Sequence, residues 1–413
     1  MFTFGAPPGL RVVAWFLVAL AAGWLGYQFW RLTLQPGPLG AVDLRLRQLE
    51  VVEWFAGRPV YGALPNAVYP PASYLLLWPI LGWPGPALAR WIWALITLLA
   101  LFPLCSLLTR HGGARPGDWR GLPALLALSS YPVGATIGNG QLGILVLLCL
   151  LAGLPLVFER DRSWLRDFVL ATLFLLALVK PTLSAPFFWI LVFAAGSLRP
   201  ALLVGAGYAV SSCVASLFQN RNPLDLMRAW LERGLAGSSF GARHGEGSIR
   251  TVTGEAGAQM LQIKSVNLHS VLSFIGQKEL LLPASLLVLA LLGSWIFWNR
   301  KAGSAWVLIG VTALVTHFSF YHGWYDDLLL LLPLLALLRI RRGREPAPRL
   351  RTASGLLFVA LSLSLLAPGG TYLLPHPWAN VYVVAQALLW LLVLGFLVSL
   401  VRRPEPARPA VRT

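Results

Sequence analysis

The sequence has few charged residues, and acidic ones are especially scarce. Only 12% of its 413 residues are charged, whereas a soluble domain usually has about 25%. Hydrophobic residues make up 57% of the chain. These values exclude an ordinary soluble domain and indicate an integral membrane protein. Because one span needs roughly 20 apolar residues, the chain has room for about a dozen spans.

Cysteine is also rare, and the common motifs of nucleotide chemistry are missing. The three cysteines, Cys105, Cys149 and Cys213, all lie in apolar segments and have neither disulfide nor metal-ligand spacing. The sequence contains no phosphate-binding glycine loop before a helix and no cytosolic nucleotide-binding domain. These absences argue against an ATP-driven pump and against a nucleotide-sugar enzyme with a soluble catalytic domain.

Most of the basic residues lie in short loops between apolar segments, so the net charge of +17 indicates topology rather than nucleic-acid binding. Twelve spans with both termini in the cytoplasm place most of these residues inside. The first apolar run is too long for a signal peptide, and we interpret it as a retained span. The expected spans are 12–34, 87–108, 122–136, 142–158, 168–179, 183–198, 201–218, 280–298, 305–320, 328–340, 354–367 and 381–401.

A shorter apolar piece, 72–83, is interpreted as re-entrant or interfacial because counting it as a span would invert every later loop. We expect an all-α fold in a single membrane-embedded domain over 1–413. It has an outer catalytic loop at 35–86, a long outer loop at 219–278 and a disordered basic tail at 402–413. The long loop is expected to contain an amphipathic helix, "NPLDLMRAWLERGL", and a glycine-rich, poorly structured part at 234–257.

The first outer loop carries three carboxylates, Asp43, Glu50 and Glu53. They lie on an amphipathic stretch whose leucines can face lipid, while Arg45, Arg47 and the glutamates reach water or each other. One interpretation is a solvated interfacial helix with Asp43 as its N-cap. The other makes Asp43 a general base that faces an acceptor hydroxyl just outside the bilayer.

Further polar residues fall on the same outer face under this topology. Several of these residues have an ordinary structural explanation. Tyr69 can precede a helix start, Asn139-Gly140-Gln141 can form a simple turn, and Lys180 can extend to the membrane interface. Their functional interpretations are hydrogen bonds to a sugar, and binding of a phosphate by a cation. The candidate substrate-binding residues are Tyr69, Asn139, Gln141, Lys180, Asn267, His322 and Asp326. The stretch "THFSFYHGWYDD" has no HExxH spacing, so no metal is expected.

Several blocks taken in order resemble one family. They are "GRPVY" at 57–61, "VYPPASYLLLWP" at 68–79, "NGQLGILVLLCLLAGL" at 139–154, "ALVKPTLSAPFF" at 177–188, "SVNLHSVLSFI" at 265–275 and "FYHGWYDDLLLLLPLL" at 320–335, preceded by an Asp soon after the first span. Together they are similar to the GT-C glycosyltransferases of family 87, which include polyprenyl-phosphate-mannose-dependent mannosyltransferases. The "SVNLHS" block departs from the family's usual Asn-Gln-Ser pattern at Leu268-His269.

The resemblance implies inverting transfer of a hexosyl, in particular a mannosyl, group from a polyprenyl-phosphate sugar to a lipid or glycan acceptor. It implies reaction on the outer face of the cell membrane, with no nucleotide and no cofactor. The family's catalytic Asp corresponds in position to Asp43, and Lys180 and His322 are the candidate phosphate partners. The alternatives are a transporter or lipid-linked sugar flippase, which would show similar halves with paired broken helices, and a non-catalytic scaffold. We find no convincing repeat.

Overall fold

The chain is almost entirely helical in its computed structural model, which describes residues 8–37, 39–64, 67–113, 120–159, 162–243, 249–253, 259–301, 304–320, 323–343, 346–366 and 374–401. The first helices are α1 Pro8–Thr33, α2 Val42–Phe55, α3 Val60–Ala63, α4 Pro71–Leu81, α5 Pro86–His111, α6 Leu122–Ser129, α7 Tyr131–Asn139, α8 Gly143–Val157 and α9 Trp164–Ala177. The middle elements are α10 Pro181–Ser184, η1 Ala185–Phe187, α11 Phe188–Ala194, α12 Arg199–Leu217, α13 Pro223–Arg243, β1 Ile249–Thr253, β2 Gln259–Ile263 and α14 Leu268–Phe274. The last are η2 Lys278–Leu280, α15 Leu281–Asn299, α16 Ala305–Ser319, η3 Trp324–Leu330, α17 Leu331–Arg342, α18 Pro348–Leu366 and α19 Trp378–Val401.

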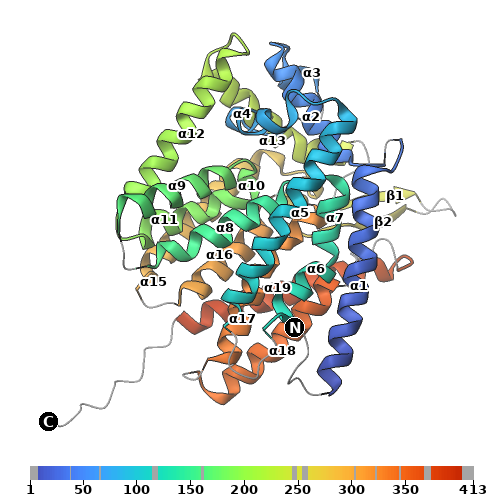
Figure 1. Cartoon of the computed structure of the whole chain (residues 1–413), viewed down its shortest axis with the longest axis vertical. Coiled ribbons are helices and arrows are strands. Elements are labelled where there is room, and N and C mark those ends of the chain that lie inside the picture. The colour runs from blue at the N-terminus through green and yellow to red at the C-terminus, as the bar shows by residue number, and fades with distance from the viewer. Residues whose placement is uncertain are drawn as a thin grey trace.

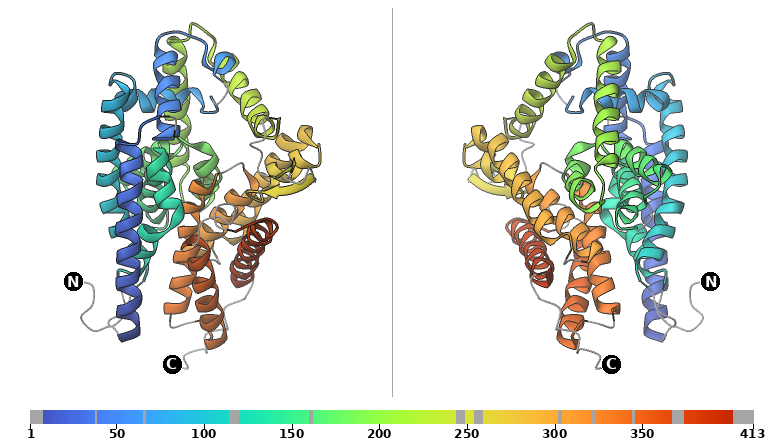
Figure 2. Two further views of the ribbon diagram at one scale, coloured as in Figure 1. Left: turned by 90° about the vertical axis from the view of Figure 1, so that its right-hand side faces the viewer. Right: turned by 90° about the vertical axis from the view of Figure 1, so that its left-hand side faces the viewer.

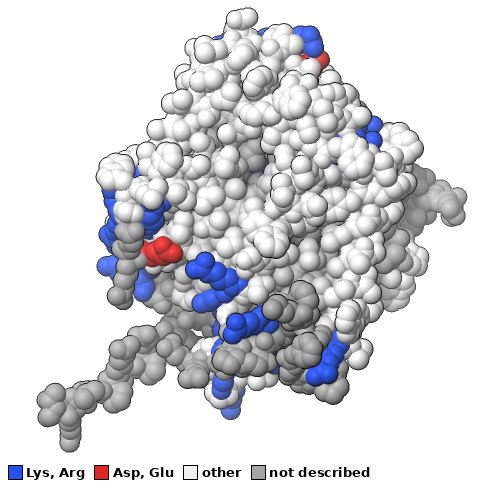
Figure 3. Space-filling model, viewed as in Figure 1, with Lys and Arg blue, Asp and Glu red and all other residues white. Residues whose placement is uncertain are grey.

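Six of the described helices are long and apolar enough to cross a membrane: α1, α5, α12, α15 with η2, α18 and α19. Only 22–39% of their most apolar windows is buried inside the protein. The remaining surface carries large apolar side chains, such as Phe102, which is 82% exposed. Figure 3 shows a broad uncharged area over the upper part of one face, with Lys and Arg mainly along its left and lower margins. This surface suits contact with lipid.

Shorter apolar helices fill the centre of the molecule. Nearly every residue of α16 is buried, as is the run Leu331–Leu338 of α17. A helix that is apolar all round is stable only where other elements surround it. Helices α9, α18 and α19 supply such neighbours, with α8 packed on α9, α17 on α18 and α16 on α19 (Figure 1).

The first loop forms a small helical layer, α2 to α4, at one end of the molecule (Figure 1). Trp54 of α2 is fully buried and donates a hydrogen bond from Nε1 to the carbonyl oxygen of Ala215 on α12, at 2.8 Å. Gln219 returns a bond of 2.6 Å to the carbonyl oxygen of Trp54. From the end of α12, α13 leads back toward the β1–β2 hairpin and α14 (Figure 2). The first loop is therefore fastened to the body of the protein.

The expected all-α, polytopic fold is confirmed, but several expected spans are broken into shorter helices. Segment 122–136 divides into α6 and α7 at Ser130, which is extended just before Tyr131-Pro132. Pro132 has no N–H to donate to the preceding turn, so it can begin a helix but not continue one. The break expected at Lys180-Pro181 is present, and Pro186 divides the next segment again at η1. Segment 328–340 is the end of η3 followed by α17.

Two expectations about the outer loops need correction. Arg47 and Glu50 reach each other and Leu49 and Val52 are exposed, as expected, but the charged pair is buried in the protein and α2 is therefore not a solvated helix on that side. The stretch 234–257 is not simply unstructured: 234–243 continue α13, and 249–253 pair antiparallel with 259–263. The remainder of that stretch and the tail 402–413 lie outside the described residues.

Replacing Trp54 by alanine should strongly destabilise the first-loop layer. Its ring stacks on Tyr74 with 4.6 Å between centroids and meets Tyr61 edge-on, and loss of a large buried aromatic costs about 3–5 kcal/mol. We expect a clearly lower melting temperature in detergent for Trp54→Ala. The matched control is Trp83→Ala, since Trp83 is 62% exposed. Equal melting temperatures for the two variants would show that the layer is not held by Trp54.

Candidate active site

Asp43 lies in the first turn of α2, half-buried, and its carboxylate accepts a hydrogen bond from the side chain of Gln141. Gln141 belongs to the tight turn between α7 and α8. Gly140 in this turn has φ +69°, and a Cβ on it would come within 2.5 Å of the Leu44 Cβ. A glycine is needed there both for the left-handed backbone and for the close approach of α2. The turn thereby brings the Gln141 amide to Asp43.

Lys180 contacts the same amide through its oxygen. Its Nζ donates to Gln141 Oε1 at 3.3 Å and to Asp326 Oδ1 at 2.5 Å, and it lies 4.9 Å from the centroid of the Tyr325 ring. Lys180 occupies the break between α9 and α10, and Asp326 lies in η3, where its other oxygen accepts from the backbone N–H of Gly323. A continuous chain of contacts therefore runs Asp326–Lys180–Gln141–Asp43.

The buried side of α2 adds a second set of charges. Arg47 donates to Glu50 Oε2 at 2.5 Å, and its guanidinium lies over the Tyr69 ring, 4.5 Å from the centroid. Tyr74 donates from its hydroxyl to the same Glu50 oxygen at 3.3 Å. Arg47 lies one turn after Asp43, so a single guanidinium serves carboxylates on both sides of it along the helix.

Burial is the largest influence on both carboxylates of α2. It raises the pKa of Asp43 above its ordinary value, although the hydrogen bond from Gln141 and the charges of Arg47 and Lys180 act in the opposite direction. Burial also raises the pKa of Glu50 to about 7, against the opposing effects of Arg47 and Tyr74. A carboxylate with a raised pKa is a stronger proton acceptor when ionised, so Asp43 suits general-base chemistry.

The structure thus brings together five of the residues singled out in the sequence: Asp43, Tyr69, Gln141, Lys180 and Asp326. They come from α2, from the stretch before α4, from the α7–α8 turn, from the α9–α10 break and from η3. Tyr69 is buried, with its ring against Arg47. None of these segments is adjacent in sequence to another, so the fold alone assembles the cluster.

Two other candidates are engaged elsewhere. Asn139 accepts a hydrogen bond of 3.2 Å from Arg31 at the end of α1. Asn267 caps α14, and its Oδ1 accepts from both the backbone N–H and the hydroxyl of Ser270 at 2.8 and 2.9 Å. These contacts give both side chains a structural role. His322 lies outside the described residues.

The two neighbouring aspartates of η3 face different partners. Asp326 pairs with Lys180, whereas Asp327 lies 3.5 Å from His317 Nε2 on the buried α16. Within the described ranges, no group of three or more His, Cys, Asp or Glu residues is arranged to hold a metal ion.

Sequence reasoning missed the buried positions of Arg47, Glu50 and Tyr74. A signal was available in the spacing: Asp43, Arg47, Glu50 and Trp54 recur at intervals of four, three and four, which places them on one helical stripe. The stripe contains charges as well as an aromatic ring, and charges on an amphipathic helix usually indicate its water-facing side. In the folded protein it is the inward side.

Comparison with known proteins identifies the family of the chain. The protein-family model "Glycosyltransferase family 87" matches residues 67–320, more than half of the chain. No curated protein and no solved structure matches the chain. The match includes Tyr69, Gln141 and Lys180, while Asp43 and Asp326 lie outside it and join the site through the fold. The chain therefore belongs to glycosyltransferase family 87 and is a polytopic membrane glycosyltransferase.

Proposed function

We propose that this enzyme transfers a hexosyl group, in particular a mannosyl group, from a polyprenyl-phosphate sugar to a lipid or glycan acceptor with inversion, and that Asp43 is the general base. The observation that carries the proposal is the Gln141 amide, which hydrogen-bonds the Asp43 carboxylate and the Lys180 ammonium together. A proton acceptor and a cation are thus held within reach of one side chain. In the proposed transfer from a phosphodiester donor, the first would accept the proton of the acceptor and the second would stabilise the departing phosphate.

The proposed reaction is a single displacement. The acceptor hydroxyl gives its proton to the Asp43 carboxylate as its oxygen forms a bond to the anomeric carbon. The bond from that carbon to the phosphate oxygen breaks, and the electron pair leaves with polyprenyl phosphate. Phosphate is already a good leaving group, so this scheme assigns no general acid. It uses no metal and no other cofactor.

Lys180 is proposed to stabilise the charge that develops on the departing phosphate. An ammonium has three N–H donors, and Asp326 and Gln141 accept two of those of Lys180. The third is left for a phosphate oxygen, and Asp326 fixes the position of the cation. His322 is proposed as a second phosphate partner. Tyr69 is proposed to line the sugar site beside Arg47.

We place the site on the outer face of the cell membrane, with both termini in the cytoplasm. Support comes from the two ends of α5. Just before the start of α5, the carbonyl oxygen of Pro84 accepts a hydrogen bond of 2.7 Å from the side chain of Gln48 on α2. This end of α5 therefore lies beside the helix that carries Asp43. At the other end of α5, Arg339 and Arg342 donate to the carbonyl oxygens of His111 and Gly112 at 3.0 and 2.8 Å. The arginine-rich end is therefore opposite the candidate active site, and basic loops favour the cytoplasm.

Asp43→Asn should abolish transfer while leaving the protein folded. The amide keeps the shape of the side chain but cannot accept a proton, and loss of a general base costs about 10²-fold or more in rate. The measurement is transfer from labelled polyprenyl-phosphate mannose to an acceptor extract, with melting temperature as the check on folding.

The control for this test is Glu53→Gln, since Glu53 lies on the same helix as Asp43 but pairs with the exposed Arg58, which follows the helix. That variant should transfer at the normal rate. A folded Asp43→Asn enzyme with normal activity would remove Asp43 from the mechanism.

The rate should also fall in acid, because Asp43 must be ionised to accept a proton. With its pKa raised by burial, the acid limb of kcat/KM should have its midpoint above the ordinary aspartate value of 3.8. Gln141→Ala removes a hydrogen bond that lowers the pKa, so the limb should move to still higher pH. The exposed Gln277→Ala should not move it. An unmoved limb in Gln141→Ala would show that the amide does not act on the base.

A further inference from the structure

A groove between α11 and α12 is lined only by apolar side chains and backbone. It has a cavity volume of about 520 Å³, within the range of roughly 300–1,000 Å³ typical of ligand sites. Its lining is Phe188, Val192, Leu198, Ala201, Leu202, Gly205 and Ala206. Small residues on α12 keep it open, and a Cβ placed on Gly205 would meet nothing within 4 Å. The groove can therefore take a linear apolar chain.

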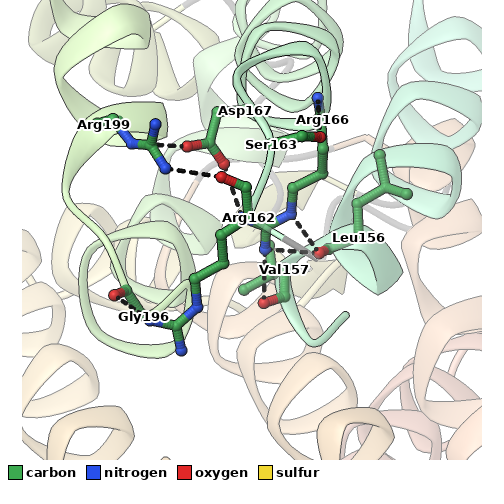
Figure 4. A network of polar contacts seen from close by, with 8 residues as sticks. All are labelled: Leu156, Val157, Arg162, Ser163, Arg166, Asp167, Gly196 and Arg199. Carbon is green, nitrogen blue, oxygen red and sulfur yellow. Dashed lines mark hydrogen bonds and ion pairs between the residues drawn. The ribbon is translucent and has the colours of Figure 1, made fainter. Parts of the chain in front are cut away.

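Arginine side chains gather where the groove ends, at the turn that joins α11 to α12 (Figure 4). Arg162 donates from Nη1 to the carbonyl oxygen of Gly196 at 2.9 Å. Arg199, next to the groove residue Leu198, donates to the carbonyl oxygen of Arg162 at 2.8 Å and lies over the exposed ring of Trp164, 4.7 Å from its centroid. An arginine stacked on an exposed tryptophan is typical of a membrane interface.

The positive charge at this turn exceeds what the neighbouring carboxylates neutralise. Asp167 is fully buried and pairs with Arg166 at 2.7 Å and Arg199 at 3.1 Å. Arg166 also donates to the carbonyl oxygens that end α8 (Figure 4). By sequence, the stretch 159–167 together with Arg199 contains four arginines and three carboxylates, an excess of one positive charge. Arg162 is exposed, with one of its five N–H donors used in the contact to Gly196.

We propose that this groove is a binding site for an anionic phospholipid, with an acyl chain between α11 and α12 and the phosphate headgroup against Arg162 and Arg199. The apolar lining and the excess positive charge at one end match the two parts of such a lipid. A zwitterionic lipid carries no net charge to match the arginines.

The site is distinct from the candidate active site. Helix α12 has 19 residues, so it is roughly 28 Å long. The groove adjoins its first residues, whereas Ala215 near its other end contacts Trp54 of α2. A lipid in the groove is therefore a structural or regulatory ligand rather than the sugar donor.

The test is native mass spectrometry of the full-length protein in detergent, titrated with phosphatidylglycerol or phosphatidylcholine. We expect the protein to retain phosphatidylglycerol tightly and to bind phosphatidylcholine more weakly. Arg162→Gln should weaken phosphatidylglycerol binding about fivefold, because one arginine near a lipid surface contributes about that factor. Gly205→Phe should abolish the retained lipid by filling the groove, and its side chain enters open space, so folding should be unaffected.

Matched controls are Arg110→Gln, an exposed arginine at the end of α5, and Gly23→Phe, an exposed glycine of α1 with nothing within 4 Å of its Cβ position. Both should bind as the unchanged protein does. Equal retention of the two lipids would overturn the proposal. So would Arg162→Gln and Gly205→Phe variants that bind phosphatidylglycerol as well as their controls.

Discussion

The buried ion pair between Lys180 and Asp326 is the contact on which the candidate active site depends. It joins the α9–α10 break to η3, two segments 146 residues apart in the sequence. A buried ammonium without a carboxylate would be costly in a membrane protein. With Asp326 in place, the cation is held where it can also bond Gln141, and Gln141 in turn bonds Asp43. One pair of charges thus positions the proposed base.

The second constraint is the buried pair of charged residues on the inward side of α2. Arg47 is buried against the ring of Tyr69, and Glu50 accepts a hydrogen bond from the Tyr74 hydroxyl. Trp54 anchors the same side of the helix to α12. Burial of an unpaired charge would destabilise the helix, whereas a bonded pair is tolerated. This side therefore fixes how α2 is rotated, and the rotation decides that Asp43 faces Gln141 rather than water.

Much of this architecture could be predicted from the sequence, because it depends on local signals. Apolar runs gave the helices, proline gave the break at Lys180-Pro181, and the glycine turn gave the position of Gln141. The partners of Lys180 could not be predicted, since no local pattern links it to Asp326. The burial of the Arg47–Glu50 pair could not be predicted either, because a charged pair on an amphipathic helix usually lies at its water-facing side. Asn139 and Asn267 were selected for their chemistry, but their amides are used by Arg31 and Ser270.

The most direct test of the central claim, that Gln141 and Lys180 serve Asp43 as one unit, is a double-mutant cycle on the acid-limb midpoint of kcat/KM. Gln141→Ala, Lys180→Ala and the double variant would be compared under identical donor and acceptor concentrations. The midpoint reports on the base alone, whereas the rate also contains the proposed contact of Lys180 with the phosphate. Each single variant should raise the midpoint, because Gln141 and Lys180 both lower the pKa of Asp43, and the double variant should raise it by less than the sum of the two shifts, because residues in one network are not additive. If the two shifts simply add, the residues act on Asp43 independently and the central claim is wrong.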